Sequence, residues 1–399
     1  MNKKSNSIRT WWKKPKQSSA LEEHRQVSFL ELFYDLVYVA LIAQLSHALT
    51  DELTMHGSFK FIFLFTMIWW YWLNGSLYHD LYGNNDIRTR VFTFLQMISV
   101  VGMAVFASEA FHKGAIGFTI SAISLLVILL FLWLRVGYHE KKTKIFSNLY
   151  ASLLAINIGL LCTSLFVKSP LNHRLWFATI TISFLAPTFM YIFSFFSKKM
   201  NIHEFPQASA ALVERFGLFN IIVLGEIITS AVSGSSHVEF NTKVAILCLL
   251  GILLAIGIWW LYYDFISHRK PKKGGANFIF WYYLHLPLTA SITSIGASIL
   301  YIIKYSNKDL SANVHYLFLG SMVIIVLCIA ILYRVVDEHS ETSKYLNNNT
   351  GGLLIISCIY IVLIFIEINM YQILILSVIL LFAPILNSII KNHLKNSQN

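Results

Sequence analysis

Apolar residues fall into twelve long runs along this chain, separated by short polar loops. Each run is about 20 residues, long enough for a helix to cross a bilayer. They lie near residues 27–49, 58–80, 90–111, 114–136, 145–167, 173–197, 207–232, 242–266, 278–303, 312–335, 351–369 and 371–390. Almost nothing joins the last two, so 351–390 could alternatively be one broken helix. The pattern predicts an all-α polytopic membrane bundle of about 12 transmembrane helices.

The first run carries acids where a lipid-facing helix would have none. Glu31 and Asp35 are four residues apart and share one helical face, which Tyr38 continues. A carboxylate in hydrocarbon costs several kcal/mol unless it is paired, protonated or hydrated. We therefore expect this face to point into the protein. The alternative is that Glu31 lies near the membrane surface and caps or anchors the helix.

Composition agrees with a membrane protein. The 399 residues are 56% hydrophobic and 13% charged, with a mean hydropathy of +0.61, whereas soluble domains are about 25% charged. The four cysteines all lie inside apolar runs without metal-binding spacing, which indicates buried small side chains. The net charge of +11 resides in short loops between apolar runs, so we expect membrane lipids and not nucleic acid as partners.

The distribution of Lys and Arg predicts the orientation. With the N-terminus inside, 23 of them fall on the cytoplasmic side and 7 outside. The positive-inside rule then places both termini in the cytoplasm and the protein in the cell membrane. No cleavable signal peptide is evident. The basic tail, residues 1–26, suits an anionic membrane surface or a disordered segment equally well.

The two halves of the chain resemble each other. Residues 27–200 and 201–390 each contain six runs, followed by a cytoplasmic tail, 391–399. Four pairs of short motifs recur at similar separations, among them Trp69–Trp70 with Trp259–Trp260, and Ala186–Pro187 with Ala383–Pro384. Each pair alone could be chance. Together they predict two parallel six-helix repeats, as in transporters built from two similar bundles.

Several motifs also resemble a known family. The segment ELFYDLVYVALIAQLSHAL, residues 31–49, is similar to the N-terminal signature of the bacterial low temperature requirement A (LtrA) family. ERFGLFNIIVLGE, residues 214–226, agrees with it, as do the Trp69–Trp70–Tyr71 and Tyr283–Leu284–His285 regions. The resemblance implies a polytopic membrane protein connected with growth in the cold. It implies no particular reaction.

Charged residues at the ends of several runs predict an ionic cluster on the cytoplasmic side. Glu31, Asp35 and Glu214 lie near the start of runs that begin on the cytoplasmic side. His79, Asp80 and Asp264 lie near the end of runs that finish on that side, so we expect both sets at the same depth. The cluster could serve chemistry, or it could be a set of salt bridges that fixes the bundle.

Three further residues are candidates for a substrate or proton pathway. Glu226 lies twelve residues after Glu214, about 18 Å further along the helix and near the midplane. It could carry a proton, or it could be a neutral group making one interhelical hydrogen bond. Arg215 could neutralise an acid or bind an anionic group. His285 could belong to a proton relay or be structural.

The sequence favours a transporter over an enzyme. It has no Walker-type loop, no GxGxxG, no HExxH and no GxSxG elbow, so we expect no nucleotide, metal or other cofactor. The leading hypothesis is a secondary, proton-coupled carrier of an unidentified small or lipid-like solute. The alternatives are an intramembrane enzyme that acts on lipid through the cytoplasmic cluster, and a non-catalytic membrane sensor.

Overall fold

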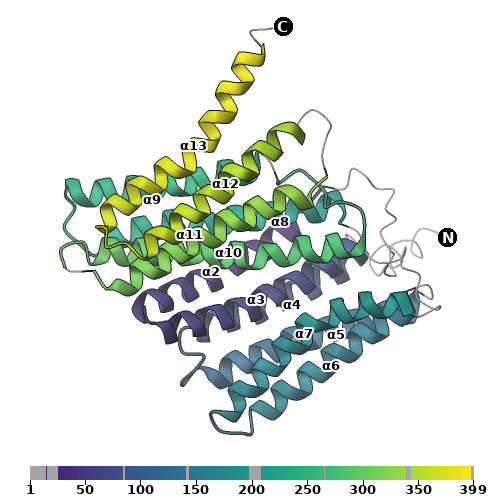
Figure 1. Ribbon diagram of the computed structural model, residues 1–399. Helices are drawn as coiled ribbons and strands as arrows, with labels where there is room; N and C mark the ends of the chain where they lie inside the picture. Colours follow the sequence, from purple (N-terminus) through teal and green to yellow (C-terminus); the bar gives the residue numbers. More distant parts are fainter. Residues whose placement is uncertain are drawn as a thin grey trace, which may run out of the picture. The chain divides into compact units, whose positions relative to one another are not determined.

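The computed structural model describes residues 15, 26–83, 86–140, 143–196, 208–264, 266–308, 310–337 and 343–396. This part of the chain forms twelve helices and no strand, apart from an isolated bridge between Pro271 and Val336 (Figure 1). The helices are α2 (Phe29–Asp51), α3 (Met55–Tyr82), α4 (Ile87–Phe106), α5 (Ala115–His139), α6 (Lys144–Ser164), α7 (Leu171–Phe196), α8 (Ala210–Ser235), α9 (Thr242–Tyr263), α10 (Gly275–Lys304), α11 (Ala312–Val335), α12 (Ser343–Ile364) and α13 (Met370–Asn396). Each corresponds to one predicted run, and the all-α membrane bundle is confirmed.

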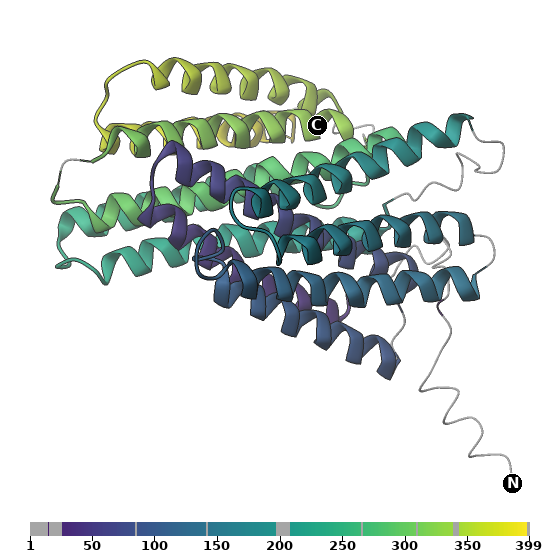
Figure 2. The same ribbon diagram turned by 90° about the horizontal axis from the view of Figure 1, so that it is seen from below.

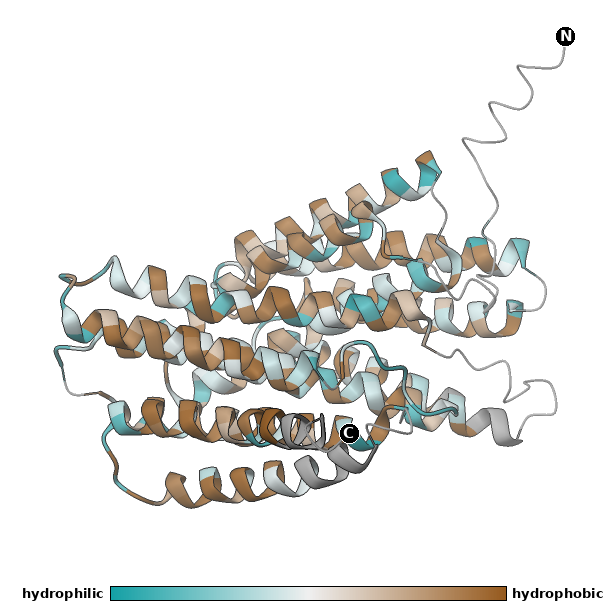
Figure 3. Ribbon diagram, turned by 90° about the horizontal axis from the view of Figure 1, so that it is seen from above, coloured by the Kyte–Doolittle hydropathy of each residue, from teal (hydrophilic) through white to brown (hydrophobic). Residues whose placement is uncertain are grey.

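Nine of the described helices are long and apolar enough to span a membrane. The other three described helices are α3, α7 and α12. In α12, the apolar part is shorter and comprises Thr350–Ile364. Helix α12 ends at Ile364 and α13 begins at Met370, with the non-helical residues 365–369 between them, so the last two runs are two helices and not one broken helix. Residues are hydrophobic along most of each helix, and hydrophilic residues concentrate in loops and at helix ends (Figure 3).

The chain divides into two compact units. Unit 1 contains α2 up to Leu45, α3 from Phe63, the helices α4 to α7, and α8 up to Arg215. Unit 2 contains residues Ser46–Ile62 and everything from Phe216 onward. The predicted division into two six-helix repeats at residue 200 stays a prediction. The predicted basic tail, except Pro15 and Gln26, lies outside the described residues.

In unit 1, the helices α4, α5, α6 and α7 pack in chain order. Helix α4 begins where the Asp86 side chain accepts a hydrogen bond from the backbone N–H of Thr89, because that N–H has no partner inside the helix. On α5, Leu125 and Leu129 are buried while Val127 and Phe131 are exposed. Such an apolar exposed face is what a helix presents to lipid, since the bilayer is itself apolar.

In unit 2, α10 is the most buried of the candidate spans. It packs against α9 and α11; α11 packs against α12, and α9 and α12 both contact α13. Helices α11 and α12 lie side by side in both views (Figures 1 and 2). The last turns of α2 also reach α10, where the Thr50 hydroxyl donates to the carbonyl of Ala297 at 3.2 Å.

Close packing of α8 on α10 depends on Gly296. A Cβ at this position would lie 3.2 Å from Cγ and 3.3 Å from the carbonyl oxygen of Glu226. We expect Gly296→Val to destabilise unit 2 by about 1–3 kcal/mol, because the added methyls have no free volume. Gly320→Val on α11 is the matched control, since nothing lies within 4 Å of its Cβ position. Denaturant unfolding in detergent compares the two, and equal losses would contradict the packing.

Candidate functional site

Unit 1 holds a fully buried ion pair between Asp35 of α2 and Arg215 of α8. The Nε of Arg215 donates to both carboxylate oxygens of Asp35, at 3.2 and 3.0 Å, and Nη2 donates to Oδ1 at 2.8 Å. Asp35 is 0% exposed and Arg215 is 2% exposed. A guanidinium matches a carboxylate with parallel hydrogen bonds, which makes this among the strongest pairings available to side chains.

Aromatic residues complete the surroundings of this pair. Trp72 of α3 donates its indole N–H to Oδ1 of Asp35 at 2.8 Å. The ring of Tyr34 lies 5.3 Å from the centre of the Arg215 guanidinium, a cation–π geometry. Tyr34 fits because position 75 is glycine: any Cβ on Gly75 would collide with its hydroxyl. The ion pair is therefore held from α2, α3 and α8 at once.

Glu31 combines two roles that the sequence analysis kept as alternatives. Its Oε2 accepts from the backbone N–H and the hydroxyl of Ser28, at 2.9 and 2.8 Å, which caps the start of α2. Its Oε1 lies 3.9 Å from Nη1 of Arg215, and Glu31 is 5% exposed. Glu31, Asp35 and Arg215 together form what we call the unit 1 ionic cluster.

The other predicted members of the cytoplasmic cluster that lie in unit 1 have other neighbours. The His79 ring packs on Tyr34 with centroids 6.0 Å apart, and its Nε2 lies 3.3 Å from the hydroxyl of Thr93. Asp80 accepts a hydrogen bond from the hydroxyl of Ser209, just before α8. Glu214 is exposed, and the backbone N–H of Val27 donates to it at 3.3 Å.

Glu226 lies in unit 2, in the second half of α8, and is 4% exposed. Its carboxylate accepts from the hydroxyls of Thr229 and Ser230, at 3.3 and 3.2 Å, which are on its own helix. Among the residues that the structure describes, no basic side chain pairs with it. Glu226 thus differs from Asp35, whose carboxylate is paired with the guanidinium of Arg215.

His285 and Asp264 are the remaining candidates in unit 2. His285 on α10 is 1% exposed, and its Nε2 lies 2.9 Å from the hydroxyl of Tyr262 on α9. Asp264 is exposed just after α9, where it accepts from the indole N–H of Trp260 at 2.6 Å. The predicted meeting of Asp264 with the acids of α2 involves both units and stays a prediction.

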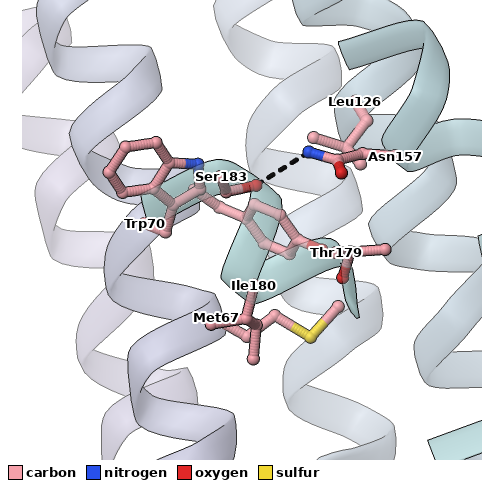
Figure 4. Close-up of a pocket in the computed structure, with 8 residues that line it drawn as sticks. Met67, Trp70, Leu126, Asn157, Thr179, Ile180 and Ser183 are labelled. Atoms are coloured by element: carbon pink, nitrogen blue, oxygen red, sulfur yellow. Dashed lines mark hydrogen bonds between the residues drawn. The ribbon is translucent and has the colours of Figure 1, made fainter. Parts of the chain in front are cut away.

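Unit 1 also contains a cavity of about 10 Å³, lined by Met67, Trp70, Tyr71, Leu126, Asn157, Thr179, Ile180 and Ser183 (Figure 4). The amide nitrogen of Asn157 donates to the hydroxyl of Ser183 across its edge at 2.7 Å. Because Pro187 has no N–H, the backbone carbonyl of Ser183, four residues earlier, lacks its usual helical hydrogen-bond donor. This favours polar groups along this side of the cavity. The volume matches about one water molecule and is too small for a solute.

Sequence reasoning missed several partners of these residues. Trp72, Tyr34 and Tyr262 read as ordinary aromatics in apolar runs, and their contacts come from other helices. The one local signal is the glycine at position 75, three residues after Trp72, because a glycine in a membrane helix permits another side chain to approach closely. In the described part of the chain, no three His, Cys, Asp or Glu side chains gather closely enough to hold a metal ion.

Comparisons with known proteins agree with the motifs. Residues 26–389 match the family described as Bacterial low temperature requirement A protein (LtrA). An uncharacterized protein of Rhizobium meliloti (strain 1021) is 25% identical over 287 residues, which cover 69% of each chain. No solved structure matches.

Proposed function

Because the chain belongs to the bacterial low temperature requirement A (LtrA) family and folds as a multi-pass membrane protein, we propose that it is a secondary, proton-coupled transporter of a small or lipid-like solute. The observation that carries this proposal is Glu226, a buried carboxyl group inside a membrane span without a basic partner among the described residues. Intramembrane ionisable groups usually mark ion or substrate pathways, because their burial is costly.

The surroundings of Glu226 suit proton binding and release. It lies about 24 Å along α8 from the helix start, in the middle third of the helix. Two hydroxyls solvate its carboxyl group in either protonation state, since a hydroxyl can donate to a carboxylate and accept from a carboxylic acid. A bare charge at this depth is costly, and the two hydroxyls supply polar contacts that reduce this cost.

In the same transporter, the unit 1 ionic cluster would hold α2, α3 and α8 in position, and it would not carry out chemistry. Every oxygen of Asp35 already accepts hydrogen bonds from Arg215, and Trp72 adds one more. An acid–base catalyst needs a carboxyl group that can reach the reacting atoms. Asp35 is fully buried, and both of its carboxylate oxygens already accept hydrogen bonds. This favours the transporter over the intramembrane lipid enzyme.

Sealed liposomes that contain the purified protein and an internal pH dye test the proposal. They are challenged with pools of osmolytes, amino acids and lipid precursors, and empty liposomes serve as the control. A transporter of this kind gives a solute-dependent change of internal pH that collapses with a protonophore. If folded protein gives no change with any pool, or forms product from lipid in detergent without a sealed compartment, the proposal fails and the lipid enzyme takes its place.

The same proposal includes the setting of the protein. The loop charges support the cell membrane with both termini in the cytoplasm, and the name of the family supports a role in growth at low temperature. A fluorescent reporter fused to the C-terminus should fluoresce only on the cytoplasmic side.

A deletion strain should grow more slowly in the cold, with rescue by the wild-type protein. Equal growth of both strains in the cold would contradict that role.

A further inference from the structure

Four buried side chains of unit 1 bring uncharged polar groups to one small cavity, which is the one drawn in Figure 4. Tyr71 comes from α3, Asn157 from α6, and Thr179 and Ser183 from α7. None of these four side chains is more than 6% exposed. Their hydrogen bonds within the protein leave several donors and acceptors unused, so the cavity is a candidate binding site for a small polar molecule.

The side-chain amide of Asn157 is satisfied at one end only. Its nitrogen donates to the hydroxyl of Ser183 at 2.7 Å, and the two side chains point toward each other at the edge of the cavity (Figure 4). Its oxygen is buried and has no hydrogen-bond partner among the described residues. A flip of the amide would exchange the two ends and still leave one of them unpaired. Because an unpaired buried acceptor is costly, this oxygen indicates that a donor lies in the cavity.

The other polar side chains of the lining supply complementary groups. Among the described residues, the hydroxyl of Tyr71 has no hydrogen-bond partner. The hydroxyl of Ser183 accepts from Asn157, and its own proton has no acceptor in the described part of the chain. The hydroxyl of Thr179 donates to the carbonyl of Trp176 at 2.7 Å, and its oxygen can still accept. The lining therefore offers two donors and two acceptors.

The size and the chemistry of the cavity fit water. A water molecule donates two hydrogen bonds and accepts two, and a buried water usually has two to four polar partners. None of the eight residues that line the cavity carries a formal charge, so an ion would be buried here without a counter-charge, which is costly. A volume of about 10 Å³ holds about one water molecule and excludes larger polar molecules.

We infer that the cavity is a binding site for one water molecule, which joins α3, α6 and α7 through hydrogen bonds. The water donates to Oδ1 of Asn157 and to the hydroxyl oxygen of Thr179. It accepts from the hydroxyls of Tyr71 and Ser183. No proton is transferred and no covalent bond changes.

The position of the site gives this water a structural role. Asn157 lies about 20 Å along α6 and Ser183 about 18 Å along α7, so neither is at a helix end. Pro187, one turn after Ser183, interrupts the backbone hydrogen bonds of α7 at this level. Ordered water is one of the groups that let a membrane helix tolerate a proline. The site therefore stabilises α7 where its own hydrogen bonding is weakest, and it does so independently of the proposed transport.

Nuclear magnetic resonance of ¹⁵N-asparagine-labelled protein in lipid bilayers tests the site. Transfer of proton magnetisation from water to side-chain amides identifies the amides that lie beside bound water. Asn157→Leu assigns the Asn157 amide signal by its loss, and Ser183→Ala gives a second assignment because it shifts the same signal. In the wild-type protein we expect clear transfer to the Asn157 amide, although this residue is 4% exposed.

Cavity-filling variants separate a bound water from water that arrives by another route. Leu126 lines the cavity, so Leu126→Phe should displace the water and lower the transfer to Asn157 about fivefold or more. Ile180→Phe, from α7, is the second filling variant, for use if the first does not fold. The matched control is Val127→Phe, because Val127 is the next residue on α5 and is 47% exposed. It should leave the transfer unchanged.

Two outcomes overturn the inference. One is that the Asn157 amide of the wild-type protein receives no magnetisation from water, which would mean that the cavity is dry. The other is that a folded filling variant and the wild-type protein give equal transfer. Because the measurement needs no solute, it is independent of the proposed function: a bound water together with silent liposomes would refute only the transport.

Discussion

Replacing Asp35 with alanine should destabilise unit 1 by about 3–5 kcal/mol. The change leaves the guanidinium of Arg215 without its main partner in a place that is 2% exposed. The cost arises chiefly from an uncompensated buried charge, and only secondarily from lost hydrogen bonds. Equilibrium unfolding by denaturant in mixed micelles, followed by Trp fluorescence, measures the loss.

A double variant separates that charge effect from lost packing. Asp35→Ala combined with Arg215→Met removes both charges, and it should recover at least half of the lost stability. The exposed pair of Lys304 and Asp51, 3.3 Å apart, provides the control, since Lys304→Met should cost at most about 1 kcal/mol. A loss below about 1 kcal/mol for Asp35→Ala would contradict a structural ion pair. A double variant no better than the single one would show that packing dominates.

Glu226→Gln should abolish solute-driven proton movement, with a loss of about 100-fold or more in net uptake. Glutamine keeps the size and the hydrogen-bonding capacity toward Thr229 and Ser230, but it cannot release a proton. Exchange of labelled for unlabelled solute across the membrane should continue, because exchange needs no net proton transfer. Uptake and exchange are measured on the same liposomes, once a solute has been identified.

Glu214→Gln is the matched control for this prediction. Glu214 lies on the same helix, twelve residues earlier, and is exposed. It should retain both uptake and exchange. If Glu226→Gln keeps normal net uptake, Glu226 is only a hydrogen-bonding residue of unit 2.

The helices could be predicted from the sequence because hydropathy acts over about 20 residues at a time. All twelve runs became helices, and most boundaries agree within a few residues. The exceptions are α12, which begins at Ser343 and not near 351, and α13, which extends to Asn396, beyond the predicted end at 390. The spacing of Glu31 and Asp35 also predicted correctly that this face of α2 is buried. Such features depend only on neighbours along one helix.

The partners within the site could not be predicted, because they come from distant parts of the chain. Asp35 meets Arg215, 180 residues away, and Trp72 on a third helix. Glu214 and Arg215 are adjacent in the sequence, but a step of about 100° around the helix leaves one exposed and the other buried. The internal repeat and the orientation of the termini stay predictions.

Infrared difference spectroscopy of the protein in lipid bilayers, between alkaline and acidic pH, tests most directly whether Glu226 binds and releases a proton. We expect a carboxylic acid C=O band that grows in acid, disappears in Glu226→Gln and persists in Glu214→Gln. If Glu226→Gln leaves the carboxyl bands unchanged, Glu226 keeps one protonation state throughout, and proton coupling through this residue is wrong.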